Sequence, residues 1–196
     1  MLFLGASRNR RPTVTLSSCQ IVTTRSLNAI QSPQKRTRQP GLDPNDPLTA
    51  GIIQLQIADN SFQPAVFANG ARSAFEMIVQ AFAHGDTDTL DNLLAEDVFE
   101  NFNDAIDKRE AAGQSLETTI IGIKSANVIE ARMDGQNAMV TVKFVSEQVN
   151  VTHDAENRVV DGDPNQVTEI TDIWTFSRDT KTSNPNWRLV ETRSQN

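Results

Sequence analysis

The chain has 196 residues, of which 38% are hydrophobic, and this length and composition predict one soluble domain with a core of its own plus a tail. Residues 1–42 hold seven basic residues and no acidic one, which leaves 11 of the 18 basic residues against all 25 acidic ones in the remainder, a net charge of −14. A broad nucleic-acid-binding face is excluded for that remainder, because neutralising phosphates needs clustered Lys and Arg.

The amino-terminal segment, residues 1–42, is rich in Arg, Ser, Thr and Gln. Three interpretations stay open: a disordered tail, a mitochondrial-type targeting peptide, and a basic segment attracted to anionic lipid. Its Cys19 is the only cysteine of the chain, which excludes an intrachain disulfide and a cysteine-based metal site. No apolar run approaches the roughly 18 to 20 residues that cross a bilayer, so the chain as written is not expected to span a membrane.

The domain boundary is marked by a change from Pro- and Asp-containing sequence to apolar sequence. Residues 43–57 are predicted to be a linker, within which the apolar run from Gly51 is expected to pack as a short leading helix or turn. Residues 58–194 are expected to form the domain.

The first strongly periodic element is predicted over Pro64–His84, with Ser61 as the helix cap and Gly85 as the stop. The apolar residues of this element recur at three- and four-residue spacing and so share one stripe: Phe67, Ala71, Ala74, Phe75, Ile78, Val79 and Phe82. The stripe is expected to pack in the core. The alternative is a membrane-docking or partner-binding face.

A second helical region follows. Thr87 or Asp88 is predicted to cap a short helix that ends at Leu94, and a longer helix is predicted from Glu96 to near Gly113. The buried side of the region is expected to be Leu90, Leu93, Leu94, Val98, Phe99, Phe102 and Ile106.

From Thr118 onward the hydrophobic period changes to two, which predicts strands. Asp134-Gly135 is a hairpin signal between two of them, and Trp174 and Trp187 lie on two further strands around a turn. The segment 153–165 is predicted to be a long polar turn. Helices first and strands afterwards predict an α+β fold, with amino-terminal helices packed on a curved four-stranded antiparallel sheet.

Such a fold can enclose a pocket, and an enzyme of this shape needs a general base and an oxyanion donor. The chain has no tyrosine, and both of its histidines, His84 and His153, are expected to be exposed or locally bonded. Asp172 shares its parity with Ile170 and Trp174, so it is predicted to point inward. A buried carboxylate can act as a base, or it can accept hydrogen bonds and serve only the structure, and both interpretations stay open.

No cofactor or metal site is predicted. The sequence contains no GxGxxG, phosphate loop, GxSxG or HExxH motif. Asp161-Gly162-Asp163 is similar to the start of a calcium loop, but Pro164 follows and the closing Glu is absent, so this segment is predicted to be a turn.

Several runs of sequence carry a family likeness: Gly70–Ile106, IGIKSANVIEARMDG, TDIWTFSRD and NPNWRLVET. They resemble the domain of the inner mitochondrial membrane translocase subunit forty-four family, and most of all its alphaproteobacterial members. The resemblance covers about two thirds of the chain, from Ala58 to Thr192. It implies a cone-shaped α+β fold of the cystatin or nuclear transport factor two type, in agreement with the predicted order of elements.

The resemblance also implies a non-enzymatic adaptor or scaffold, associated with an inner membrane and linked to protein translocation or assembly. Mitochondrial relatives lie peripherally on the inner membrane, contact cardiolipin-rich lipid and tether a seventy-kilodalton heat-shock chaperone to the import channel. The chaperone-contacting region precedes this domain in those relatives, and no counterpart is recognised in residues 1–42. The expected location is peripheral on a bacterial inner membrane, or on its matrix side in a mitochondrion.

The expected ligand is lipid, cardiolipin among the candidates, or a segment of a protein of the translocation or assembly machinery. The expected binding surface is the apolar side of the Pro64–His84 helix or a pocket inside the cone. The pocket candidates are Phe75, Phe82, Val142, Phe144, Asp172 and Trp174. The alternative function is small-molecule binding or an isomerase-type enzyme that uses Asp172 as its base.

Overall fold

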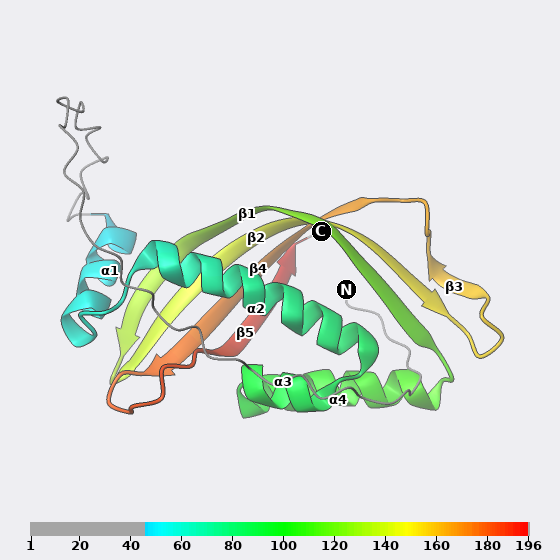
Figure 1. Cartoon of the computed structure of the whole chain (residues 1–196), viewed down its shortest axis with the longest axis horizontal. Coiled ribbons are helices and arrows are strands. Elements are labelled where there is room, and N and C mark those ends of the chain that lie inside the picture. Colours follow the sequence, from blue (N-terminus) through cyan, green and yellow to red (C-terminus); the bar gives the residue numbers. More distant parts are fainter. Residues whose placement is uncertain (1–45, 196) are drawn as a thin grey trace, which may run out of the picture.

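The computed structural model describes residues 46–195 and contains four helices and a curved antiparallel sheet of five strands (Figure 1). The helices are α1 (Pro47–Ala58), α2 (Pro64–His84), α3 (Thr87–Leu93) and α4 (Glu96–Ala111). The strands are β1 (Ser115–Asp134), β2 (Asn137–His153), β3 (Val159–Gly162), β4 (Thr168–Asp179) and β5 (Arg188–Gln195). The predicted α+β class and the curved sheet are confirmed.

The sheet arches over α2, with α3 and α4 on the same side of it (Figure 1). Two side chains of α2 fasten this helix to the backbone of β1. Arg72 donates from Nη1 to the carbonyl oxygen of Ile123 at 2.8 Å, and Gln80 donates from Nε2 to that of Thr118 at 3.1 Å. Because β1 is bonded to β2 along its other edge, α2 is held at a fixed position under the sheet.

The helix α1 begins inside the segment predicted to be a linker. Asp46 caps it by accepting from the backbone N–H of Thr49 at 3.0 Å. Its Gly51 lies against β1 so closely that an added Cβ would stand 1.7 Å from the carbonyl oxygen of Ala131. The helix therefore packs backbone to backbone on the end of the sheet, where Figure 1 shows it beside the end of β1.

The bounds predicted for the first periodic helix are those of α2, and Gly85 ends it at a φ of 66°. The predicted cap is wrong, because Gln63 precedes the helix without a side-chain bond and Ser61 bonds to Asp59 instead. The cap of α3 is likewise Asp86, whose carboxylate accepts from the N–H of Thr89 at 3.1 Å, and neither Thr87 nor Asp88. Apolar spacing in the sequence predicts the bounds of a helix better than it predicts which side chain caps it.

The strand order is β1-β2-β4-β5, with β3 paired to the far end of β2. Gly135 closes the β1–β2 hairpin at a φ of 59°, as the Asp-Gly signal predicts. Three shifts of register along β1, the first after Ile120, bend and twist this long strand. The strand β3 lies within the segment predicted to be only a turn, so the sheet has one short strand more than expected.

The core lies between α2 and the inner faces of β2 and β4. Phe75 is fully buried, stacks on Phe144 at 4.6 Å between ring centroids, and lies 4.6 Å from the ring of Trp174. Val140 and Val142 extend the same layer along β2 with no exposed surface. These side chains fill the space that the curvature of the sheet creates.

Arg109 is a buried cation in the last turn of α4, with 1% of its surface exposed. Its Nη2 donates to the carbonyl oxygen of Phe82 at 2.6 Å, and the guanidinium lies 5.2 Å from the centre of the Phe82 ring. Burial lowers the pKa of Arg109 to about 10. Phe82 lies in the last turn of α2, where the free carbonyl groups of the helix favour a nearby cation. The contact with Arg109 therefore holds α4 against the carboxyl end of α2.

Candidate functional site

The described residues form an apolar groove of about 410 Å³ between the first half of α2 and the turn that joins β4 to β5. We name it the α2 groove. On the α2 side it is lined by Val66, Phe67, Gly70, Ala71, Ala74 and Met77. On the other side it is lined by Asp59, Phe62, Leu93, Phe176, Arg178 and Trp187, among others.

Aromatic rings form one end of the groove. The ring centroids of Phe67 and Trp187 are 4.7 Å apart, and Phe62 lies 5.8 Å from Phe67 and 5.9 Å from Trp187. On the helix side, 64% of the surface of Val66 and 47% of that of Met77 are exposed. Burying such a surface against an apolar partner is favourable, because it removes apolar area from water.

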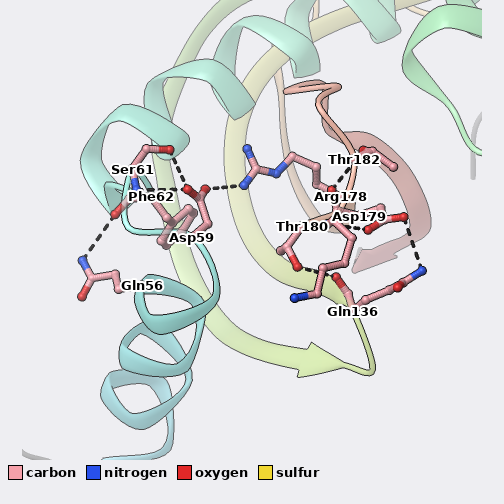
Figure 2. A network of polar contacts seen from close by, with 10 residues as sticks. Gln56, Asp59, Ser61, Phe62, Gln136, Arg178, Asp179, Thr180 and Thr182 are labelled. Atoms are coloured by element: carbon pink, nitrogen blue, oxygen red, sulfur yellow. Dashed lines mark hydrogen bonds and ion pairs between the residues drawn. The ribbon is translucent and has the colours of Figure 1, made fainter.

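A largely buried ion pair lines the groove, and Figure 2 shows it between the turn that follows α1 and the end of β4. Arg178, at the end of β4, donates to the carboxylate of Asp59 in the turn between α1 and α2, and 15% and 17% of the two side chains are exposed. Asp59 also accepts from the N–H and the hydroxyl of Ser61 at 3.0 and 2.7 Å. The guanidinium of Arg178 lies 5.3 Å from the centre of the Trp187 ring, so one cation contacts both Asp59 and Trp187 on the side of the groove opposite α2.

The hydroxyl of Ser61, and then Arg178, hold the pKa of Asp59 below its ordinary value of 3.8. A carboxyl whose folded-state pKa is depressed contributes stability above its unfolded pKa and loses it as the pH falls through the folded one. We therefore expect Asp59→Asn to lower the free energy of unfolding at pH 7 by roughly 1–3 kcal/mol, and by less at pH 3. Urea unfolding of the unchanged protein and of Asp59→Asn, each at pH 7 and at pH 3, measures this difference in the free energy of unfolding.

The control for this substitution is Asp104→Asn. Asp104 pairs with Lys108 at 3.7 Å, but more than 70% of each side chain is exposed, so its loss should change stability by less than about 0.5 kcal/mol. An effect of Asp59→Asn that is equal at pH 7 and pH 3 would contradict the assignment.

A smaller hollow of about 260 Å³ adjoins the α2 groove, and we name it the polar hollow. Its polar lining residues are Ser177, Arg178, Asp179, Thr182, Asn184, Asn186 and Arg188. Arg178 and Asn186 line both spaces, so the two lie next to each other. The end of the apolar groove is thus marked by two arginines.

The sequence model of the Tim44-like domain matches residues 48–194. The chain belongs to the Tim44-like domain family. The resemblance found in the sequence is thereby confirmed, and the match includes α1 as well as the rest of the fold.

Individual relatives match this chain over part of their own length. The mitochondrial import inner membrane translocase subunit TIM44 of Rattus norvegicus is 27% identical over 116 residues, 58% of this chain and 26% of that protein. A probable subunit of this kind from Caenorhabditis elegans, tin-44, is 27% identical over 121 residues, 60% of this chain and 28% of its own length. The chain therefore spans about a quarter of these mitochondrial relatives.

A bacterial relative and a solved structure also match the Tim44-like domain. An uncharacterised protein of Rickettsia prowazekii is 27% identical over 139 residues, 71% of this chain and 56% of that protein. The crystal structure of the intermembrane space region of the chloroplast protein ARC6 has a TM-score of 0.47 and 16% identity, covering 68% of this chain and 96% of that one.

The six residues predicted to form a pocket lie in the core of the Tim44-like domain. Phe75, Phe144 and Trp174 pack together, Val142 pairs with Trp174 in the register of β2 and β4, and Phe82 packs on Phe102 at 4.8 Å. Asp172 points inward as predicted, opposite Phe144, with 6% of its surface exposed. None of the six lines the α2 groove or the polar hollow, and a binding role for them stays a prediction.

The other candidate groups of the Tim44-like domain lie apart from the groove. His84 is exposed at the end of α2, with Nδ1 2.8 Å from the carbonyl oxygen of Gln80, and His153 pairs with Ser115 in the sheet. Within residues 46–195, no group of three or more His, Cys, Asp or Glu could hold a metal ion. In the same range, the structure has no helix that is both long and apolar enough to cross a membrane. The segment 1–42 lies outside the described residues.

Proposed function

We propose that this chain is a non-enzymatic, membrane-associated adaptor that serves protein translocation or assembly at an inner membrane. Two of its relatives are named as subunits of the mitochondrial import inner membrane translocase, which supports the process. The α2 groove carries the proposal, because exposed apolar side chains beside aromatic rings are typical of a surface that binds a partner.

The proposed membrane contact is hydrophobic and peripheral, on the inner membrane of a bacterium or on its matrix side in a mitochondrion. On α1, 80% of the surface of Ile57 and 38% of that of Ile53 are exposed, and α1 precedes the groove directly. The net charge of −14 outside residues 1–42 opposes electrostatic attraction to anionic lipid such as cardiolipin. Binding through this part of the chain should therefore depend weakly on salt.

Vesicle flotation tests the membrane contact. We expect the full chain to float with cardiolipin-containing vesicles, and Ile57→Asp to reduce the bound fraction at least about fivefold, because an apolar side chain contributes about 1.5–3 kcal/mol when it is buried. The matched control is Ile121→Asp, on β1, where 55% of the isoleucine is exposed away from α1. At 0.5 M salt, a fragment of residues 46–196 should float with the vesicles to the same extent as the full chain.

Two negative results together would reject the proposed adaptor function. If neither the full chain nor residues 46–196 float with such vesicles, and cross-linking in cells recovers no protein of the translocation or assembly machinery, the proposed function fails.

A further inference from the structure

We propose that the α2 groove receives an α-helical segment of a partner protein, which lays its apolar face along α2 over Gly70 and places a carboxylate in the polar hollow. This inference rests on the proposed adaptor function and names the kind of ligand that the groove takes.

Gly70 is the first observation. It lies in the interior of α2, is exposed, and has no positive φ, and a Cβ added to it would meet nothing within 4 Å. Glycine in the middle of a helix lowers stability by roughly 0.5–1 kcal/mol relative to alanine, and no contact among the described residues requires it here. Its missing side chain keeps the α2 wall of the groove low at this point, so that another backbone can approach α2 closely.

The shape of the groove fits a helix. Its α2 wall runs from Val66 to Met77, which is about 16 Å at 1.5 Å per residue, or three helical turns. Gly70 and Ala74 lie one and two turns beyond Val66 on the same face, so small residues occupy the centre of the wall and large apolar ones its ends. A partner helix would fill this space with side chains spaced three, four and seven residues apart.

The charges favour a protein segment over an anionic bilayer. Leu93 of α3 lines the groove, and the α3–α4 region around it, residues 86–110, carries nine carboxylates, all of them exposed. None of the nine lines the groove, but an anionic bilayer covers a wider area than the groove and would bring many phosphates near them, whereas a helix with one carboxylate at one end would not.

The polar hollow supplies the donors for that carboxylate. Arg178 is already paired with Asp59, although its Nε is buried without a partner among the described residues. Arg188 is exposed, donates from Nη1 to the carbonyl oxygen of Leu94 at 3.4 Å, and lines the same hollow with the side-chain amides of Asn184 and Asn186. The carboxylate of Asp179 also lines the hollow and accepts from the N–H of Lys181 at 2.7 Å. A carboxylate there would accept charge-assisted hydrogen bonds from Arg188 while the apolar face stays on α2.

A selection from a phage-displayed library tests this inference. The library presents 18-residue helical peptides with one face randomised, and the target is the full 196-residue chain. We expect enriched peptides to share apolar residues at helical spacing and an Asp or Glu near one end. Gly70→Trp, which fills the groove, should weaken their binding at least tenfold, and Arg188→Gln about three- to tenfold.

Asn69→Trp is the matched control, because Asn69 is an exposed neighbour on α2 outside the groove lining, and it should change binding less than twofold. Exchanging the acidic residue of a selected peptide for its amide should abolish the effect of Arg188→Gln. Met77→Glu repeats the test at the rim of the groove, so the inference stays testable if Gly70→Trp does not fold.

Two results would overturn the inference: no peptide is enriched, or the enriched peptides bind Gly70→Trp and Met77→Glu as tightly as the unchanged chain. If a fluorescent phosphatidylglycerol binds the chain and loses affinity in both variants while no peptide is enriched, the groove is a lipid site and the helical ligand is rejected. The adaptor function survives that result. Conversely, absent flotation with intact peptide binding removes the membrane contact and leaves the helical ligand.

Discussion

Replacing Phe75 with alanine is expected to lower the free energy of unfolding by about 3–5 kcal/mol. The ring has no exposed surface and lies 4.6 Å from the ring centroids of both Phe144 and Trp174. Because α2 is bonded to β1 through Arg72 and Gln80, it cannot move inward to fill the cavity that alanine would leave. Urea unfolding, followed by circular dichroism and tryptophan fluorescence, measures the change.

Phe99→Ala is the control for this substitution. Phe99 is half-buried at the edge of the core, so its removal should have less than half the effect of Phe75→Ala. A loss below about 1.5 kcal/mol for Phe75→Ala would mean that the layer between α2 and the sheet is not the main core.

Replacing Gly51 with alanine is expected to lower the free energy of unfolding by about 1–3 kcal/mol, or to detach α1 from the sheet. The new Cβ would lie 1.7 Å from the carbonyl oxygen and 2.6 Å from the carbonyl carbon of Ala131, and backbone atoms of a paired strand cannot yield. Thermal unfolding measures the first outcome. Proteolysis in the turn between α1 and α2, at residues 59–63, detects the second.

The sign of this effect is diagnostic, because glycine to alanine in a helix is ordinarily stabilising by roughly 0.5–1 kcal/mol. Gly70→Ala should show that ordinary gain, since nothing lies within 4 Å of its added Cβ. Equal gains at Gly51 and Gly70 would show that α1 does not pack on β1 as described.

The elements that the sequence predicts well are those whose signals are local. The apolar stripe and Gly85 give the bounds of α2, Asp134-Gly135 gives the first hairpin, and the parity of Trp174 gives the inner face of β4. The packing of α1 could not be predicted, because its apolar residues surround the helix and its key contact is with a strand far along the chain. The strand β3 was not predicted, because its four residues lie within a segment of mostly polar sequence.

The apolar side of α2 was predicted as a binding surface, and Phe67, Ala71 and Ala74 of its stripe line the α2 groove, but the open space of the groove could not be predicted. Large apolar side chains at inward positions, such as Trp174, indicate what is buried. The groove depends on space that is left open where the α1–α2 turn, α2 and the β4–β5 turn meet. Val66 and Met77 fall outside the apolar stripe of α2, so periodicity assigns them to solvent. Gly70, a helix-interior glycine, was the one local signal.

The packing of Gly51 on Ala131 has a consequence for the order of synthesis. The surface that receives α1 leaves the ribosome about 80 residues after α1 itself, a delay of about 4–16 s at ordinary elongation rates. During that interval the apolar side chains of Ile52 and Leu55, buried in the finished fold, have no sheet to cover them. The nascent chain therefore carries an uncovered apolar segment throughout that interval.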